Sequence, residues 1–251
     1  MGTNESNMER AKLRNDFMIE NKILAIIPAR GGSKRIPNKN VIALNGKPLI
    51  EYTIESAIQS KKIQKIVVTS DSDEILKIAK KYENITTHKR KENISNDYSP
   101  TSEAIIDVLK GNEEYDFIML LQPTSPLRGY NQINEAIELL NRKNAKQIVS
   151  VTKCETSPLW CNKLDNTLSL ENFFDESKAL QRSQDLEQYY KLNGAIYISD
   201  TKEYLKSKSF FSSNRKYAYI MERSFSIDVD EELDLYLAEA MISFNKGNKE
   251  F

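Results

Sequence analysis

Short apolar runs alternate with helix-like segments along most of this chain. The expected strands, rich in apolar and β-branched residues, are 23–28, 65–70, 117–121, 147–151, 195–199 and 217–221. The expected helices are 49–60, 73–81, 102–110, 131–142 and 231–245. This alternation predicts an α/β fold, a mostly parallel, Rossmann-like sheet with helices on both faces. Ligands of such sheets bind at the carboxyl ends of the strands.

The chain is expected to form one domain, residues 23–251, behind an N-terminal extension, residues 1–22. The extension is charged and lacks the apolar centre of a signal peptide, so we expect it to be frayed or weakly helical. The α/β pattern breaks over residues 155–192, a polar and aromatic stretch that holds the only tryptophan. We expect this stretch to be an insertion that forms a small antiparallel lobe.

Charge and cysteine content narrow the possible partners. Lysine plus arginine and aspartate plus glutamate both total 36, and a chain without basic excess is a poor ligand for nucleic acid or anionic membranes. Its longest apolar stretch, 23–29, is far too short to span a membrane. Cys154 and Cys161 form neither a zinc pattern nor a disulfide framework, which favours a cytoplasmic protein. Any metal should therefore be a hard, oxygen-liganded ion.

A glycine-rich basic loop, residues 29–40, follows the first expected strand. Gly31 and Gly32 allow backbone N–H groups to approach a ligand closely, and Ser33 adds a hydroxyl donor. The four cations of this basic loop are Arg30, Lys34, Arg35 and Lys39. Together these groups suit a triphosphate. The loop matches neither a Walker A motif nor a dinucleotide fingerprint, and its position after a buried strand disfavours an ordinary solvated loop.

Asp228 and Asp230 alternate in the sequence SIDVD, the acidic segment at residues 226–230. Residues two apart in an extended chain point the same way, so the two carboxylates should face one side. Mg²⁺ binds one or two carboxylates together with substrate phosphates, which predicts a magnesium site here. A rival pair, Asp71 and Asp73, follows the second strand. Because Asp73 suits a helix cap or first turn, we interpret that pair as mainly structural.

Five segments together resemble the acylneuraminate cytidylyltransferase family. They are residues 27–40 (IPARGGSKRIPNKN), 69–71 (TSD), 120–128 (LLQPTSPLR), 192–197 (LNGAIY) and 226–230 (SIDVD). The resemblance runs from residue 23 to about residue 242 and implies a fold of the nucleotide-diphospho-sugar transferase type. It also implies the reaction: CMP passes from CTP to the anomeric hydroxyl of a nine-carbon acidic sugar, N-acetylneuraminic acid or a relative, and pyrophosphate is released.

The resemblance implies a role for each matching residue. The nucleotide-binding residues would be Arg30, Gly31, Gly32, Ser33, Lys34, Lys39, Asn40, Arg90, Thr101 and Ser102, with Arg90 reading the base. The sugar-binding residues would be Gln122, Lys191 and Asn193. The catalytic residues would be Arg30, Lys34, Asp228 and Asp230, with Mg²⁺ held by the two aspartates. Members of the family are usually homodimers joined through the insertion, and we expect the same here.

Two departures from the family pattern leave the sugar open. Trp160 follows Ser157-Pro158-Leu159 where sialic-acid members carry a lysine nearby, and Arg182 and Ser183 are offset from a family arginine. Legionaminic or pseudaminic acid is therefore an alternative substrate. A CMP-Kdo synthetase or a hexose-1-phosphate nucleotidyltransferase is disfavoured by the GGSKR loop and the NGAIY motif. A non-catalytic nucleotide-binding paralogue is disfavoured because the loop cations and both late aspartates are present.

Overall fold

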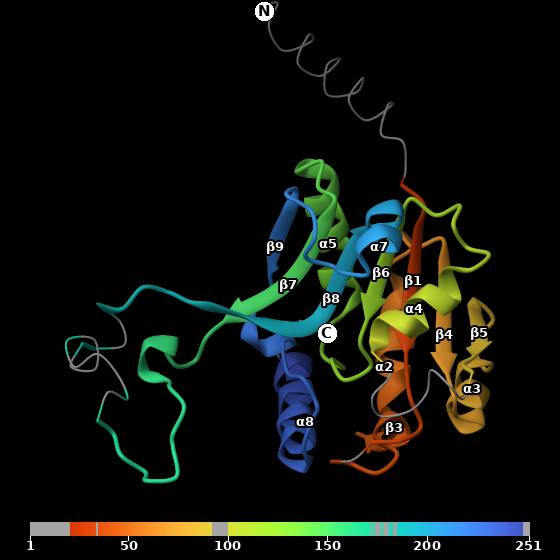
Figure 1. Cartoon of the computed structure of the whole chain (residues 1–251). Coiled ribbons are helices and arrows are strands. Elements are labelled where there is room, and N and C mark those ends of the chain that lie inside the picture. Colours follow the sequence, from red (N-terminus) through yellow and green to blue (C-terminus); the bar gives the residue numbers. More distant parts are fainter. Residues whose placement is uncertain are drawn as a thin grey trace, which may run out of the picture.

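A seven-stranded sheet forms the centre of the molecule, in the order β5-β4-β1-β6-β8-β7-β9 (Figure 1). The computed structural model describes residues 21–33, 35–91, 100–171, 173, 177, 181–182 and 185–247. Its strands are β1 (Ile23–Pro28), β4 (Lys65–Ser70), β5 (Ile85–Lys89), β6 (Phe117–Leu121), β7 (Gln147–Lys153), β8 (Tyr190–Asp200) and β9 (Lys216–Ile220). The expected strands 23–28, 65–70 and 117–121 thus match β1, β4 and β6 residue for residue.

The sheet is mostly parallel, as predicted, and β8 is the one strand that runs against both of its neighbours. Leu121 at the end of β6 pairs with Ile196 of β8. The amino-terminal part of β8 therefore lies at the carboxyl ends of β6 and β1, where α/β sheets bind their ligands. This reversal brings Asn193 and Gly194 to that edge.

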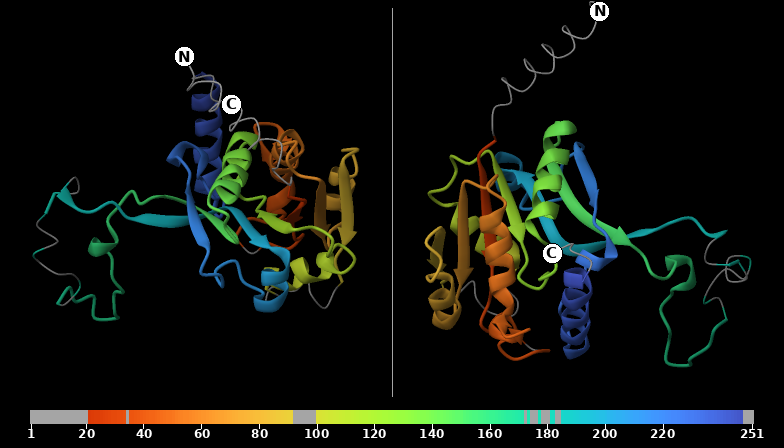
Figure 2. Two further views of the ribbon diagram at one scale, coloured as in Figure 1. Left: turned by 90° about the horizontal axis from the view of Figure 1, so that it is seen from above. Right: turned by 180° about the vertical axis from the view of Figure 1, so that it is seen from behind.

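Helices cover both faces of the sheet, which confirms the predicted α/β architecture (Figure 2). They are α2 (Leu49–Gln59), α3 (Asp73–Ala79), α4 (Thr101–Leu109), α5 (Tyr130–Arg142), α7 (Thr201–Ser207) and α8 (Glu232–Gly247). Apolar residues of α2, α3 and α5 join one core, whereas those of α4 and α7 join the core on the opposite face. Alternate residues of β1 belong to each core, as the pleat of a strand requires. None of the described helices is long and apolar enough to cross a membrane.

A third apolar cluster lies at the carboxyl edge of the sheet, around α8 and a short hairpin, β2 (Ala43–Leu44) and β3 (Lys47–Pro48). Ile36 of the basic loop and Val229 of the acidic segment are both buried in it, together with Ile242 of α8. Two segments almost 200 residues apart in sequence are therefore packed onto one support. Val229 lies behind the two aspartates, as the alternation predicts.

The described residues between β7 and β8, within the range 154–189, form an arm that projects from the body (Figures 1 and 2). The two strands pair as far as Lys153 with Tyr190, so residues 190–192 belong to the sheet and not to the insertion. In its described residues the arm contains no strand, and a 3-10 turn spans Pro158–Trp160. The described part of the arm shows no antiparallel strand pairing of its own, and the antiparallel lobe stays a prediction. Side chains such as Asp165, which accepts hydrogen bonds from Thr167, form local turns in place of strand pairing.

Candidate active site

A polar cavity, called here the loop cavity, opens at the carboxyl ends of β1, β4 and β6. It gathers residues from the basic loop, the end of β5, the start of α4, the loop after β6 and the acidic segment. The lining residues are Pro28, Arg30, Ser33, Lys39, Asn40, Arg90, Thr101, Gln122, Pro123, Thr124, Asp228 and Asp230. Most of the residues expected to bind nucleotide or metal are thus brought together. Lys34 lies outside the described residues.

The basic loop is held in place by its own backbone contacts. The Gly31 N–H donates to Asp71 Oδ1 at 2.8 Å, and Asn40 Nδ2 donates to the Arg30 carbonyl at 2.8 Å. A Cβ at Gly31 would lie 3.0 Å from the Ser72 Cβ, so a larger residue here would require Ser72 to shift. Gly31 and Gly32 do not line the cavity, and Gly31 uses its N–H on Asp71. This bond supports the structural reading of Asp71.

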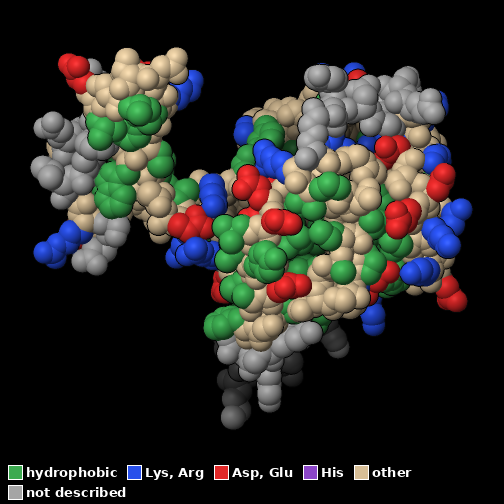
Figure 3. Space-filling model, turned by 90° about the horizontal axis from the view of Figure 1, so that it is seen from below, with side chains coloured by type: hydrophobic (Ala, Val, Ile, Leu, Met, Phe, Trp, Pro, Cys, Tyr) green, Lys and Arg blue, Asp and Glu red, His purple; other side chains and the backbone are tan. Residues whose placement is uncertain are grey.

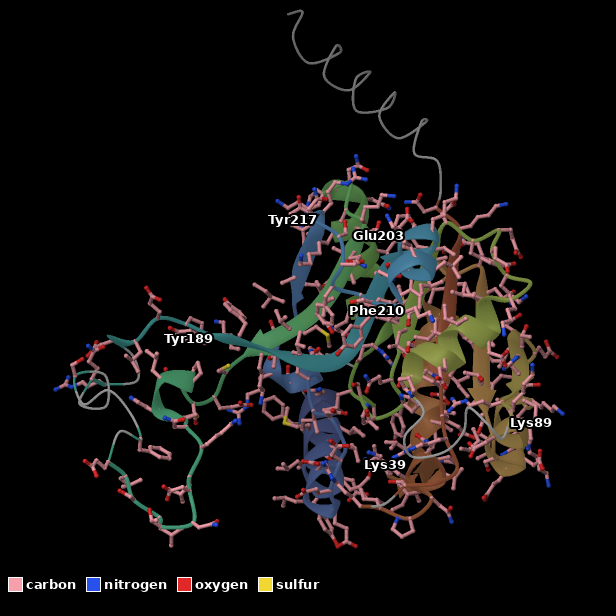
Figure 4. The ribbon with its side chains drawn as sticks, in the orientation of Figure 1. Lys39, Lys89, Tyr189, Glu203, Phe210 and Tyr217 are labelled. Atoms are coloured by element: carbon pink, nitrogen blue, oxygen red, sulfur yellow. The ribbon has the colours of Figure 1, made fainter. Side chains whose placement is uncertain are left out.

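Asp230 is the member of the acidic pair whose negative charge is balanced by neighbouring cations. Lys39 Nζ donates to Asp230 Oδ1 at 2.8 Å and also to the Val229 carbonyl at 2.8 Å. Arg35 Nη1 lies 3.0 Å from Asp230 Oδ2. The hydrogen bond from Lys39, with the charges of Lys39 and Arg35, holds the pKa of Asp230 below its usual value. Figure 4 places Lys39 close to α8 and the β2–β3 hairpin.

Asp228 has the opposite environment, although it lies only two residues away. Burial raises the pKa of its carboxyl; a hydrogen bond with Thr124 opposes this rise, and the charge of Asp230 adds to it. Its buried Oδ1 has no hydrogen-bond partner among the described residues. A carboxylate oxygen without a partner at the wall of a polar cavity is suited to a cation.

A second cavity, called here the arm cavity, meets the loop cavity at Gln122 and Asp228. Gly194 lines the arm cavity beside these two residues: a Cβ there would be 3.5 Å from Asp228 Oδ2 and 3.7 Å from Gln122 Oε1. Its φ of +77° is a conformation that other residues rarely adopt. The residues lining the arm cavity are Gln122, Thr152, Glu155, Lys191, Leu192, Asn193, Gly194, Tyr197, Arg223, Ser224, Ser226, Ile227, Asp228, Asp234, Leu237 and Met241.

Three predicted site residues lie away from the loop cavity. Lys191 lines the arm cavity and pairs with Glu155. Asn193 is buried, and its amide connects Ser150 Oγ at 2.6 Å with Ser226 Oγ at 3.0 Å, so its geometry is that of a positioning residue. Ser102 borders a separate cavity beside α4, whereas its neighbour Thr101 faces the loop cavity.

Arg90 follows β5 and reaches the loop cavity from a largely buried position. One of its guanidinium nitrogens, Nη2, donates to the Thr69 carbonyl at 3.1 Å, which anchors the side chain to β4. Burial lowers the pKa of Arg90, and the nearby carboxylate of Asp71 opposes that shift. The anchored guanidinium is thereby held at the wall of the loop cavity.

Sequence reasoning assigned no role to Thr124 or Arg128, two residues of the LLQPTSPLR motif. Thr124 contacts Asp228, as described above. Arg128 is fully buried and donates to Thr53 Oγ1 at 2.7 Å and to the Ala195 carbonyl at 3.1 Å. Its burial lowers its pKa to about 9. The only available signal was a charged residue ending an otherwise uncharged motif, and that pattern does not distinguish a buried arginine from an exposed one.

A basic loop and two carboxylates that face one cavity at this edge of the sheet define a nucleotidyltransferase. The family model described as "Cytidylyltransferase" matches residues 24–249, nearly the whole described chain. The chain therefore belongs to the cytidylyltransferase family.

Relatives within the family carry names for three different sugars. The chain is 38% identical over 238 residues to the CMP-N,N'-diacetyllegionaminic acid synthase of Legionella pneumophila, covering 90% of this chain and 98% of that protein. It is 36% identical over 228 residues to the pseudaminic acid cytidylyltransferase of Campylobacter jejuni, with 89% and 97% covered. It is 38% identical over 218 residues to the N-acylneuraminate cytidylyltransferase of Escherichia coli, covering 86% of this chain and 51% of that longer protein.

A solved structure of the same fold is CMP:2-keto-3-deoxy-manno-octonic acid synthetase complexed with CTP. It aligns with a TM-score of 0.67 over 90% of this chain and all of that one. The sequence identity is 15%, so this likeness concerns the fold alone. It confirms the expected α/β architecture of the nucleotide-diphospho-sugar transferase type.

Proposed function

We propose that this protein transfers CMP from CTP to the anomeric hydroxyl of a nonulosonic acid, releasing pyrophosphate. The observation that carries the proposal is the junction of two cavities at Gln122 and Asp228. One cavity is lined by loop cations suited to phosphates, and the other can receive an acceptor. A phosphorus atom and an attacking hydroxyl can meet only where two such cavities join. The names of the relatives agree with this chemistry.

In the proposed reaction the hydroxyl attacks the α-phosphate in line with the departing pyrophosphate. Negative charge builds up on the phosphoryl oxygens and on the leaving group. Arg30 and Lys39 line the loop cavity and supply fixed positive charge there, and Lys34 of the same loop is assigned the same task. Gln122, at the junction, orients the acceptor toward the α-phosphate. Arg90 reads the cytosine base.

The acidic pair fits Mg²⁺. Asp228 and Asp230 offer the hard oxygen ligands that this ion prefers, and Asp228 Oδ1 is buried without another partner among the described residues. Within the described ranges no group of three or more His, Cys, Asp or Glu side chains is arranged to hold a metal. Substrate phosphates would therefore complete the coordination. The ion would balance phosphate charge and lower the pKa of a coordinated hydroxyl.

The acceptor is N-acetylneuraminic acid or a related nonulosonic acid, with legionaminic and pseudaminic acid as the alternatives. Relatives of similar identity carry names for each of these sugars, so identity alone does not choose among them. A CMP-Kdo synthetase remains a less favoured alternative, because its likeness concerns the fold alone. A non-catalytic paralogue is disfavoured because Arg30, Lys39, Asp228 and Asp230 all line one cavity.

The assembly and location are also part of the proposal. Leu164, Leu168 and Leu170 of the arm are more than half exposed, which favours a homodimer that covers them. Cys154 and Cys161 are free thiols, in keeping with a cytoplasmic protein.

Pyrophosphate release from CTP, UTP and ATP, measured across a panel of nonulosonic acids and Kdo, tests the function. We expect CTP-dependent release with at least one nonulosonic acid and little or none with Kdo. Equal rates with UTP, or no release with any acid of the panel, would contradict the proposal.

A further inference from the structure

An ion-pair cluster lies at the rim of the arm cavity, where the arm joins the body. Glu155 Oε2 lies 2.8 Å from Lys191 Nζ, and Glu155 Oε1 lies 3.4 Å from Arg223 Nε. The three residues come from three segments: the start of the arm, β8 and the 3-10 turn η5 (Arg223–Phe225). Figure 3 shows positive and negative side chains gathered at this junction, and Figure 4 places Tyr189 at the same root of the arm.

The charges of this cluster matter because of what else lines the cavity. Lys191 and Arg223 are the only cations among its described lining residues. The other charged groups are the carboxylates Asp228 and Asp234, and much of the remaining wall is apolar. Among the described lining residues, these two are therefore the cations that a substrate carboxylate can meet in this cavity. Both cations, however, are already paired with Glu155.

Glu155 is well suited to be a temporary partner. The hydrogen bond from Lys191, with the charges of Lys191 and Arg223, holds the pKa of Glu155 below its usual value, so the side chain is an anion at neutral pH. All three side chains are at least one-third exposed. Exposed ion pairs contribute little to stability, so an arriving anion can replace one at small cost.

We infer that Glu155 occupies the site of the acceptor's carboxylate in the empty enzyme and exchanges with that carboxylate when the acceptor binds. This inference rests on the proposed function and extends it to a residue that selects the substrate. An acidic sugar restores the charge balance of Lys191 and Arg223 when Glu155 leaves. A neutral sugar leaves the two cations with Glu155 and gains no such contact, so the exchange favours acids over neutral sugars.

The variant Glu155→Gln removes the internal competitor while keeping its shape. We expect the KM for the acidic acceptor to fall by about two- to fivefold, the size of a weak exposed ion pair. The KM for CTP should stay at the wild-type value. An acceptor analogue whose carboxylate is converted to a carboxamide should show no gain. Arg223→Gln should raise the KM for the acidic acceptor by about tenfold or more, because a charge-assisted hydrogen bond is lost.

Glu138→Gln is the matched control. Glu138 pairs with Lys62 at 2.6 Å on the outer side of α5, and it lines neither cavity. This variant loses a comparable surface ion pair and should leave the acceptor KM at the wild-type value. A melting temperature for each variant separates loss of folding from loss of binding.

An acceptor KM that is unchanged or raised in folded Glu155→Gln would overturn the inference. A decrease in KM that Glu155→Gln also shows with the carboxamide analogue would overturn it too. If Glu155→Gln does not fold, Arg223→Gln decides: the inference requires a raised KM for the acid and an unchanged one for the carboxamide. A wild-type protein that releases no pyrophosphate would instead refute the proposed function, so the two failures are distinguishable.

Discussion

Asp228 and Asp230 are neighbours on one extended segment, but the protein treats their charges in opposite ways. Lys39 and Arg35 stabilise the ionised form of Asp230, whereas burial disfavours the ionised form of Asp228. A buried negative charge beside a cavity destabilises the folded protein, and a cation that binds there offsets this destabilisation. The contrast separates the two aspartates by their effects on stability as well as on rate.

Asp228→Asn and Asp230→Asn should each lower Mg²⁺-dependent turnover by about 100-fold or more, because each removes an anionic ligand. Their melting temperatures without metal should diverge at neutral pH. Because its pKa is raised, ionised Asp228 destabilises the fold above that pKa, so Asp228→Asn should melt at or above the wild-type temperature. The pKa of Asp230 is lowered, so its ionised carboxylate stabilises the fold at pH values above the pKa of the unfolded state. Asp230→Asn should therefore melt below the wild-type temperature.

Both differences in melting temperature should shrink as the pH falls through the folded pKa of each carboxyl, where the wild-type side chain is also uncharged. Asp73→Asn is the control, since the side chain of Asp73 is 90% exposed and pairs with Lys89 outside the loop cavity. Near-normal activity in both late-aspartate variants would mean that the metal assignment is wrong.

Gly194→Ala should damage both stability and activity. An alanine at φ +77° is strained by about 1–2 kcal/mol, and relief of that strain would move the backbone beside Asp228 and Gln122, which the added Cβ contacts at ordinary van der Waals distance. Gly111→Ala is the matched control, because Gly111 has a φ of +87° and nothing within 4 Å of its added Cβ. Urea unfolding should show similar losses for the two variants, whereas pyrophosphate release should fall only in Gly194→Ala. Equal activities would show that the junction tolerates the methyl group.

At the scale of elements, strands buried on both faces were predicted residue for residue, whereas exposed strands were predicted with shifted bounds, as β9 was, or missed, as β5 was. β1, β4 and β6 match the expectation because continuous apolar runs report burial directly. β5 was missed because Thr86, Thr87 and His88 of this edge strand carry no apolar run. The amino-terminal part of β8 was missed for a related reason: its residues Tyr190–Leu192 are exposed, and β7 bulges opposite it.

The candidate site was predictable where loops carry concentrated charge and was missed where a side chain acts through others. Arg30, Lys39, Asp228 and Asp230 lie in short motifs after strands, and all line the loop cavity. The Asn193 bridge depends on β8 running backwards, and the Thr124 contact with Asp228 joins two segments that are far apart in sequence. No local pattern in the sequence reports the direction of a single strand.

The carboxyl end of β5 supplies a test of base recognition, because it places two adjacent cations in different surroundings. Arg90 lines the loop cavity, whereas Lys89 binds Asp73 and the Asp71 carbonyl outside it (Figure 4). Arg90→Ala should weaken the apparent affinity for CTP and reduce the preference for CTP over UTP. Lys89→Ala should change neither. Steady-state assays with both nucleotides decide the matter, and unchanged CTP selectivity in folded Arg90→Ala would exclude the base-reading role.

At the scale of the whole molecule, the arm carries leucine side chains that a single chain leaves exposed to solvent. Light scattering at micromolar concentration should give twice the mass of one chain, because exposed leucines of the arm need a covering surface. Leu168→Glu combined with Leu170→Glu should shift the protein toward the monomer. Leu205→Glu, on α7, is a comparable change elsewhere and should leave the mass unchanged. A monomeric wild-type protein would contradict the proposed assembly.

The reversed direction of β8 has a consequence for how this protein can diversify. The backbone that walls the arm cavity continues without interruption into the root of the arm, through Lys191 and Tyr190. Insertions and deletions farther out cost little, since lengthening a loop adds only slowly to its closure entropy. The outer arm is therefore less constrained in length than its root, which borders the site of the chemistry. Mutations in the outer arm can thus change what the arm contacts without changing the product of the reaction.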